Sequence, residues 1–188
     1  AEMKKLFKKI YCYTLSILRQ LYLREGKKLK LNKFTKAVKL KCKKIRLKNS
    51  NFTVPSGSTV FSFQSKTTCR DMMEIMKVAY DNEFLRNLWK NKEYVVNIAG
   101  DNRRTEKITT TVKDNEFEQH YKILGGKTGT LALVGHELLI CNLAIVTEID
   151  NQPIIAVVMN IDSPENRFSV TKEILDYAKG QTTELNIN

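Results

Sequence analysis

The sequence predicts an α+β fold, in which a mainly antiparallel sheet is packed against helices. Apolar residues recur at helical spacing in the first half of the chain, and two long apolar, partly β-branched runs follow, Leu138 to Ile149 and Pro153 to Ile161. A chain of 188 residues with 42% apolar content can bury one sizeable core. We therefore expect a single domain over residues 1–180, with a basic helical N-terminal part at 1–48 and a tail at 181–188.

The positive charge is concentrated at the N-terminal end. The formal net charge is +12, yet residues 1–48 hold 17 Lys and Arg against only Glu2 and Glu25, which gives this part +15 and the remainder −3. An electrostatic partner, nucleic acid or an anionic membrane surface, would therefore meet this end of the chain. The apolar run from Ile10 to Leu18 is too short to span a bilayer, and Arg19 interrupts its resemblance to a signal peptide.

The cysteines do not indicate a metal site or a disulfide scaffold. They lack paired spacing and a neighbouring His cluster, and they are Cys12, Cys42, Cys69 and Cys141. We expect buried free thiols, and no cofactor.

The N-terminal part is predicted to hold two helices. Leu6 to Leu23 has apolar residues near helical spacing, and Asn32 can cap a second helix with a basic outer face. The apolar face of that second helix comprises Phe34, Ala37, Val38, Cys42 and Ile45. Asn49 to Lys66 is rich in Ser, Thr and Asn and is predicted to be a loop.

The next helix is predicted from a capping box. Thr68 is its N-cap and Asp71 follows three residues later. Its inward stripe, which we interpret as core packing, is Met72, Ile75, Met76 and Ala79. Asp81-Asn82 separates this helix from a short one around Phe84, Leu85, Leu88 and Trp89.

The region that follows is predicted to be β-structure. Tyr94 to Ile98 is a strand that ends in a turn at Gly100, and Lys107 to Val112 is Thr-rich and β-prone. We expect no catalytic role for several ionisable residues nearby. Glu116 and Glu118 are predicted on an exposed strand face, His120 on a strand edge and His136 in a turn.

The sheet is predicted to be completed by a hairpin and covered by a final helix. The two apolar runs meet across Asp150-Asn151-Gln152, and we expect both strands in the centre of the sheet. Ser163 and Pro164 begin the final helix. Its inward residues are expected to be Phe168, Ile174, Leu175 and Tyr177.

One motif has chemical content, the Lys127-Thr128-Gly129-Thr130 segment after Gly125-Gly126. A lysine supplies positive charge for a carboxylate, and the two threonine hydroxyls can donate to the same group. A glycine without Cβ lets a peptide lie alongside a strand as an added β-partner. The motif therefore predicts a site for the carboxyl end of a peptide.

The chain resembles the low-molecular-mass penicillin-binding proteins, the serine-type D-alanyl-D-alanine carboxypeptidases, from about Phe34 to Ala178. The similar segments occur in unbroken order, and they are Phe34 to Val38, Lys43 to Phe52, Pro55-Ser56-Gly57, Ser65 to Met72, Asp81 to Arg86, Gly125 to Gly129 and Arg167 to Ala178. In that family a Lys-Thr-Gly lies on an edge strand beside the active serine, opposite a Ser-x-x-Lys helix. The resemblance implies a partial β-lactamase-like, penicillin-binding transpeptidase fold.

The resemblance is incomplete where the nucleophile is expected. Ser16 is the nearest candidate for the family's Ser-x-Asn position, and no asparagine follows it. The strands and the Ser-x-x-Lys helix that precede this region in the family have no counterpart, and the single Ser-x-x-Lys, Ser169 to Lys172, comes after the motif instead of before it. No catalytic residue is thus identified, and a missing N-terminal segment or a second chain would have to supply the nucleophile.

The resemblance implies two functions that share one site. The chain is either part of a carboxypeptidase or a non-catalytic module that binds peptidoglycan stem peptides or β-lactams, with Lys127, Thr128, Gly129 and Thr130 as binding residues. It implies an extracytoplasmic place in the cell envelope. The alternative function is a basic module that binds nucleic acid or an anionic membrane.

Overall fold

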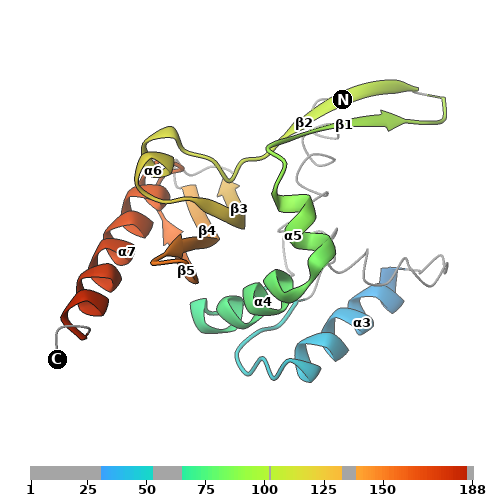
Figure 1. Cartoon of the computed structure of the whole chain (residues 1–188). Helices are drawn as coiled ribbons and strands as arrows, with labels where there is room; N and C mark the ends of the chain where they lie inside the picture. Colours follow the sequence, from blue (N-terminus) through green and yellow to red (C-terminus); the bar gives the residue numbers. More distant parts are fainter. Residues whose placement is uncertain (1–30, 53–64, 102, 133–138, 186–188) are drawn as a thin grey trace. The chain divides into compact units, whose positions relative to one another are not determined.

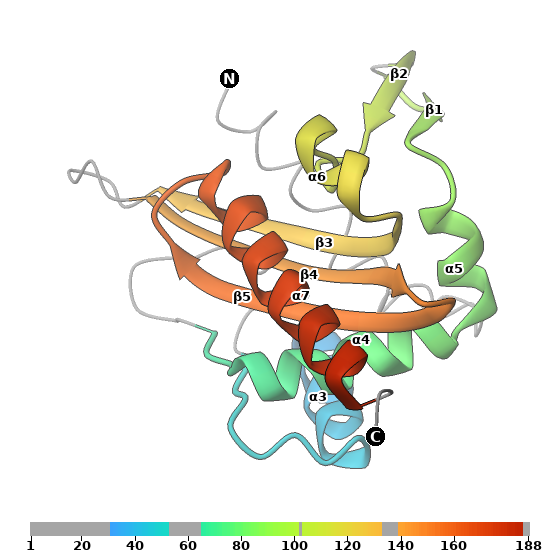
Figure 2. The ribbon, with the colours of Figure 1, turned by 60° about the vertical axis from the view of Figure 1, so that its left-hand side comes forward.

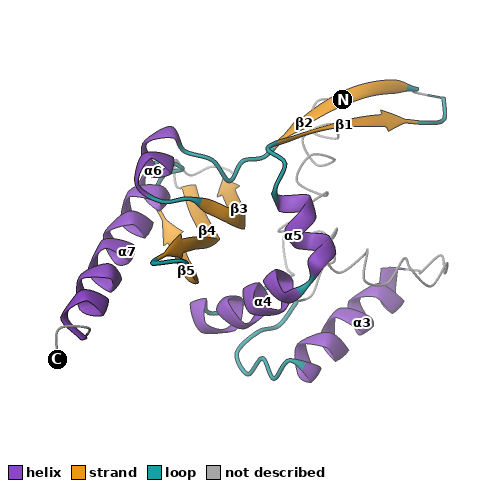
Figure 3. Cartoon of the chain, in the orientation of Figure 1, coloured by secondary structure: helices purple, strands orange, loops and turns teal. Residues whose placement is uncertain are grey.

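The computed structural model describes residues 31–52, 65–101, 103–132 and 139–185. The chain divides into two compact units, Ala1–Ile75 and Met76–Asn188, each of which is described by itself; Figure 1 labels the elements and Figure 3 colours them by type. Several sequence predictions lie outside the described residues, and they concern the helix at Leu6 to Leu23, Cys12, Ser16, Pro55-Ser56-Gly57 and His136.

The first unit contains helix α3 (Leu31–Lys44), which is amphipathic as predicted. Val38 is buried, with Cys42 and Phe52 packed against it. Asn32 lies within the helix, so the prediction that it caps the helix is wrong. The end of a helix that is inferred from one capping residue can differ from the observed end by one or two residues. The helix ends at Lys44, and Arg46, two residues later, has a φ of 60° that turns the chain out of the helical path.

Asp71 joins the start of helix α4 (Cys69–Asp81) to the segment after α3. The Thr68 hydroxyl accepts from the Asp71 N–H at 3.2 Å, which confirms the predicted cap. The Asp71 carboxylate accepts from the Ser50 hydroxyl at 2.6 Å and the Asn49 N–H at 2.8 Å. The Ser50 bond, and to a lesser extent the Asn49 bond, hold the pKa of Asp71 below its ordinary value.

The second unit begins within α4 and continues with helix α5 and a hairpin. Met76 and Ala79 of α4 are buried as predicted, and α5 (Glu83–Trp89) begins where the Asn82 side chain accepts from the Leu85 N–H. Strand β1 (Glu93–Ile98) pairs antiparallel with β2 (Arg104–Thr109). The second strand starts three residues earlier than predicted, because the turn at Gly100 sets the register of the pair.

The acidic stretch after this hairpin is a helix and not a strand. Helix α6 (Asn115–His120) contains Glu116, Glu118 and His120, so their predicted strand positions are wrong. The Asp114 side chain accepts from the Phe117 N–H and caps the helix, and Phe117 is the residue that it buries. The alternation of Glu116 and Glu118 is compatible with either element, and the cap decides between them.

Strands β3 (Ile123–Ala132), β4 (Leu139–Ile149) and β5 (Gln152–Ile161) form an antiparallel sheet in the order β3-β4-β5. The predicted hairpin is confirmed: Asp150 and Asn151 both have positive φ, as a tight two-residue turn requires. Among the described strands β4 is central, as predicted, and β5 lies at the edge.

Helix α7 (Asn166–Leu185) lies across one face of this sheet (Figure 2). Phe168 and Leu175 enter the core with Leu143, Ile145 and Val158. The predicted inward positions of two other residues are wrong, since Ile174 is 45% and Tyr177 is 71% exposed. The buried stripe follows the 3.6-residue period through Thr171 instead.

The predicted end of this helix and the predicted thiols also need correction. Helix α7 continues beyond Gly180 to Leu185, so the predicted tail is partly helical. Of the three described cysteines, all free, only Cys141 is buried, whereas Cys42 is half-buried and Cys69 is exposed. Cys69 is the first residue of α4, where a side chain has fewer neighbours than in mid-helix.

The contact between α5 and β3 requires a glycine at position 125. A Cβ at Gly125 would overlap the Trp89 ring, whereas a Cβ at Gly129 would meet its nearest neighbour, Nδ2 of Asn142, at an ordinary 3.6 Å. We predict that Gly125→Ala lowers the free energy of unfolding by about 1–3 kcal/mol. Gly129→Ala, the matched control, should change it by no more than about 0.5 kcal/mol. Urea unfolding measures both; equal effects would contradict the tight contact.

Candidate functional site

The Lys-Thr-Gly-Thr motif occupies strand β3, at the edge of the three described strands, as predicted. Lys127 pairs with Ala144, and Thr130 pairs with Cys141. Because side chains alternate along a strand, the Lys127 side chain lies on one face of the sheet and the side chains of Thr128 and Thr130 lie on the other. A ligand that met all three side chains would have to lie along the strand edge and not on one face.

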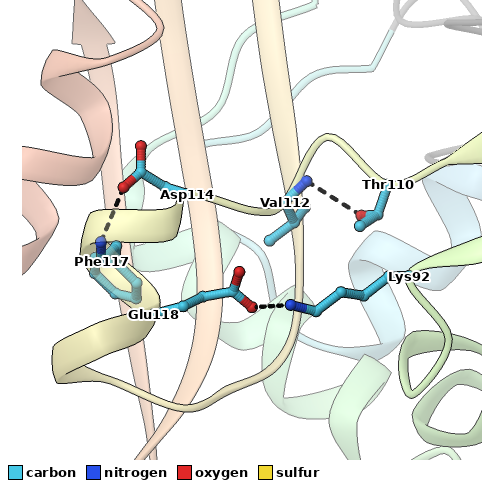
Figure 4. A network of polar contacts seen from close by, with 6 residues as sticks. All are labelled: Lys92, Thr110, Val112, Asp114, Phe117 and Glu118. Atoms are coloured by element: carbon cyan, nitrogen blue, oxygen red, sulfur yellow. Dashed lines mark hydrogen bonds and ion pairs between the residues drawn. The ribbon is translucent and has the colours of Figure 1, made fainter.

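The β2–α6 loop holds Thr128 in place. The hydroxyls of Thr111 and Thr128 are 2.5 Å apart, and Thr128 is buried. Figure 4 shows how the loop is fixed: the Thr110 hydroxyl accepts from the Val112 N–H at 3.1 Å, Asp114 caps Phe117, and Lys92 pairs with Glu118 at 2.5 Å. The Thr128 hydroxyl is therefore already engaged within the protein.

The Lys127 side chain is half-buried. Burial, and then the positive charge of Arg167, lower the pKa of Lys127 to about 8. Its Nζ donates to the Thr128 carbonyl oxygen. An ammonium group needs more than one acceptor when buried, so this lysine is poised to interact with a negative charge.

Arg167 is the site residue that sequence reasoning missed. It is only 7% exposed, and one terminal guanidinium nitrogen donates to the Thr130 hydroxyl at 3.2 Å. Its charge lies over the Phe168 ring, 5.3 Å from the centroid. One feature of the sequence could have indicated Arg167 as a site residue. It is a cation on the buried stripe of α7, one turn before Thr171 and two turns before Leu175.

The guanidinium is incompletely satisfied. The Nε of Arg167 is buried and has no hydrogen-bond partner in the part of the chain that the structure describes. Burial lowers the pKa of Arg167. Among these described residues, neither Arg167 nor Lys127 forms an ion pair.

These observations define a cationic cluster, made of Lys127, Thr130 and Arg167. Two partly desolvated positive charges that lack an anion are costly, and a carboxylate could offset that cost by accepting from the guanidinium and the ammonium together. Thr130, which is exposed at the strand edge, can donate its hydroxyl to the same carboxylate because it uses that oxygen as an acceptor for Arg167. The cluster has the chemistry of a carboxylate receptor.

The other candidate residues give no catalytic arrangement. In α7, Ser169 is exposed and the Lys172 ammonium donates to Asp176 at 2.7 Å. Within the described ranges, no group of three His, Cys, Asp or Glu residues could hold a metal ion. A helix long and apolar enough to cross a membrane is not found among the described residues either.

Comparison of the sequence with protein-family models and with curated proteins gives no match. Comparison of the structure with solved structures gives matches. The DD-transpeptidase of Streptomyces K15 matches with a TM-score of 0.63 at 20% identity, over 77% of this chain and 53% of that one. The chain thus spans about half the length of that relative.

Two further structures agree. The penicillin-binding protein D2 of Listeria monocytogenes, in its cefotaxime-bound form, matches with a TM-score of 0.58 at 18% identity, over 76% of this chain and 53% of that one. The D-alanyl-D-alanine carboxypeptidase of Mycobacterium tuberculosis matches with a TM-score of 0.59 at 14% identity, over 79% of this chain and 54% of that one. The described chain therefore has part of the α+β fold of the low-molecular-mass penicillin-binding proteins, as its motifs predicted.

Proposed function

We propose that the chain is a D-Ala-D-Ala carboxypeptidase-like protein that binds the carboxyl end of a peptidoglycan stem peptide, or the carboxylate of a β-lactam, along β3. The proposal rests on one observation above the others: next to Thr130 of β3, Arg167 has a buried Nε without a hydrogen-bond partner among the described residues. The similarity to structures of a DD-transpeptidase and a D-alanyl-D-alanine carboxypeptidase supports the same ligand class.

Each residue would have a distinct role. Arg167 offers donors in a planar fork that matches a carboxylate, and Lys127 adds a second positive charge from the opposite face of the strand. Gly129, with no side chain, lets the ligand backbone lie beside β3 as an added strand. Thr128 supports the strand through Thr111, and its hydroxyl is a ligand donor only if it leaves that partner.

The residues of this chain support binding of the peptide more directly than its cleavage. A serine nucleophile needs an adjacent base, and the one Ser-x-x-Lys of the sequence lies in α7 with its lysine engaged by Asp176. We therefore propose that the chain recognises the carboxyl end without cleaving the peptide, in an extracytoplasmic setting of the cell envelope.

The cluster predicts a carboxylate-dependent affinity. A peptide ending in D-Ala-D-Ala should bind the chain, and its C-terminal amide should bind at least tenfold more weakly, because a charged hydrogen bond is worth about 1.5–3 kcal/mol. Lys127→Ala, Arg167→Gln and Thr130→Val should each weaken binding of the acid. Lys122→Gln, which removes an exposed lysine paired with Glu148, is the matched control and should bind normally. Calorimetry measures all of these; equal binding of acid and amide would disprove the assignment.

We predict from Lys127 that peptide affinity and the free energy of unfolding change with pH in opposite directions. Peptide affinity should fall as pH rises through about 8, where the ammonium is lost. The free energy of unfolding without peptide should instead rise between pH 8 and 10, because the unfolded chain keeps the proton that folded Lys127 releases. The rise is about 3 kcal/mol at most. Lys127→Ala should flatten both profiles, and an unchanged variant profile would show that another group titrates.

Penicillin distinguishes a binding module from a peptidase. After incubation with a labelled penicillin, mass spectrometry of the intact chain should show no covalent adduct, while excess penicillin should displace the D-Ala-D-Ala peptide because both have a carboxylate. A stable acyl adduct on this chain would mean that it holds its own nucleophile and that the binding-only proposal is wrong.

A further inference from the structure

Helix α3 carries a one-sided positive charge that the carboxylate cluster does not use. Residues 31–52 contain eight basic residues and no acidic one. Six of these basic residues are exposed, and they are Lys36, Lys39, Lys43, Lys44, Arg46 and Lys48. None of the six forms an ion pair with a described residue.

An exposed leucine lies in the middle of this charge. Leu40 is 59% exposed, with Lys36 one turn before it and Lys43 and Lys44 one turn after it, so all four share a face of the helix. The opposite side of α3 is used internally, because Val38 packs against Cys42 and Phe52. We name the outward surface formed by Lys36, Leu40, Lys43 and Lys44, together with neighbouring Lys39, the α3 basic face.

Helix stability alone does not account for this surface. Cations in the last turn, Lys41, Lys43 and Lys44, favour the negative end of the helix dipole. Lys36 and Lys39 lie too early in the helix to gain from this interaction, and they repel the cations that follow them. A partner that supplies negative charge would relieve the repulsion.

We infer that the α3 basic face docks on an anionic phospholipid surface. Phosphate headgroups would offset the lysine charges, and Leu40 would enter the acyl boundary between them, which is the arrangement of an interfacial amphipathic helix. Nucleic acid fits less well, because an exposed leucine at the centre of the patch contributes nothing to phosphate contacts and Phe52, which could stack on a base, is packed against Val38.

The test uses the full chain and two kinds of vesicle. Sedimentation should show binding to equimolar phosphatidylglycerol and phosphatidylcholine, weakening with salt, and no binding to phosphatidylcholine alone. Each lysine near such a surface contributes about fivefold in affinity. Replacement of Lys36, Lys39, Lys43 and Lys44 by Gln should therefore weaken binding about 100-fold or more.

Two further variants make the test decisive. Replacement of Lys90, Lys107, Lys113 and Lys122 by Gln removes the same charge from exposed positions of the second unit and should leave vesicle binding nearly unchanged. Leu40→Gln should weaken vesicle binding about tenfold, as expected for an apolar side chain that leaves water, without affecting binding to duplex DNA. Circular dichroism verifies that each variant is folded.

Three outcomes would overturn the inference. They are equal loss in the two lysine variants, undiminished vesicle binding by Leu40→Gln, and tighter binding to duplex DNA than to vesicles at the same salt concentration. The first would indicate a diffuse charge effect, and the other two would favour a polyanion without an apolar phase.

Discussion

The antiparallel register of β3 on β4 is the constraint on which the rest of the second unit depends. It places Thr130 opposite Cys141, on the face that α7 covers, and so within reach of Arg167. A slip of one residue would exchange the faces of Lys127 and Thr130 and would turn Thr128 away from Thr111. The register is fixed by burial, since Leu143 and Ile145 on the same face of β4 belong to the core.

The cationic cluster is maintained at an energetic cost. A buried guanidinium whose Nε has no partner in the described part of the chain and a lysine with a depressed pKa both oppose folding. The Phe168 ring and the Thr130 hydroxyl offset part of this cost for Arg167. Proteins tolerate such local penalties most often where a ligand removes them, and the cluster lies at a strand edge where a ligand backbone could also pair.

Sequence reasoning recovered features that depend on local chemistry. Thr68, Asp150 and Asn151 were identifiable because caps and tight turns require particular residue types. Features set by tertiary contacts were not identifiable. The region of Glu116 is helical because Asp114 caps it. Arg167 is a site residue because α7 crosses the sheet next to Thr130. The Lys-Thr-Gly-Thr motif indicated the right strand, but not that its hydroxyls and its ammonium lie on opposite faces.

The two proposed anion-binding features, the cationic cluster and the α3 basic face, should respond differently to ionic strength. The lysines of the α3 basic face are exposed, so physiological salt screens them beyond roughly 8 Å. Lys127 and Arg167 are partly removed from solvent, and salt screens an interaction between them and a carboxylate much less. The exposed α3 basic face is therefore suited to weak, reversible attachment at a charged surface, whereas the partly buried cationic cluster is suited to selecting one functional group by its geometry.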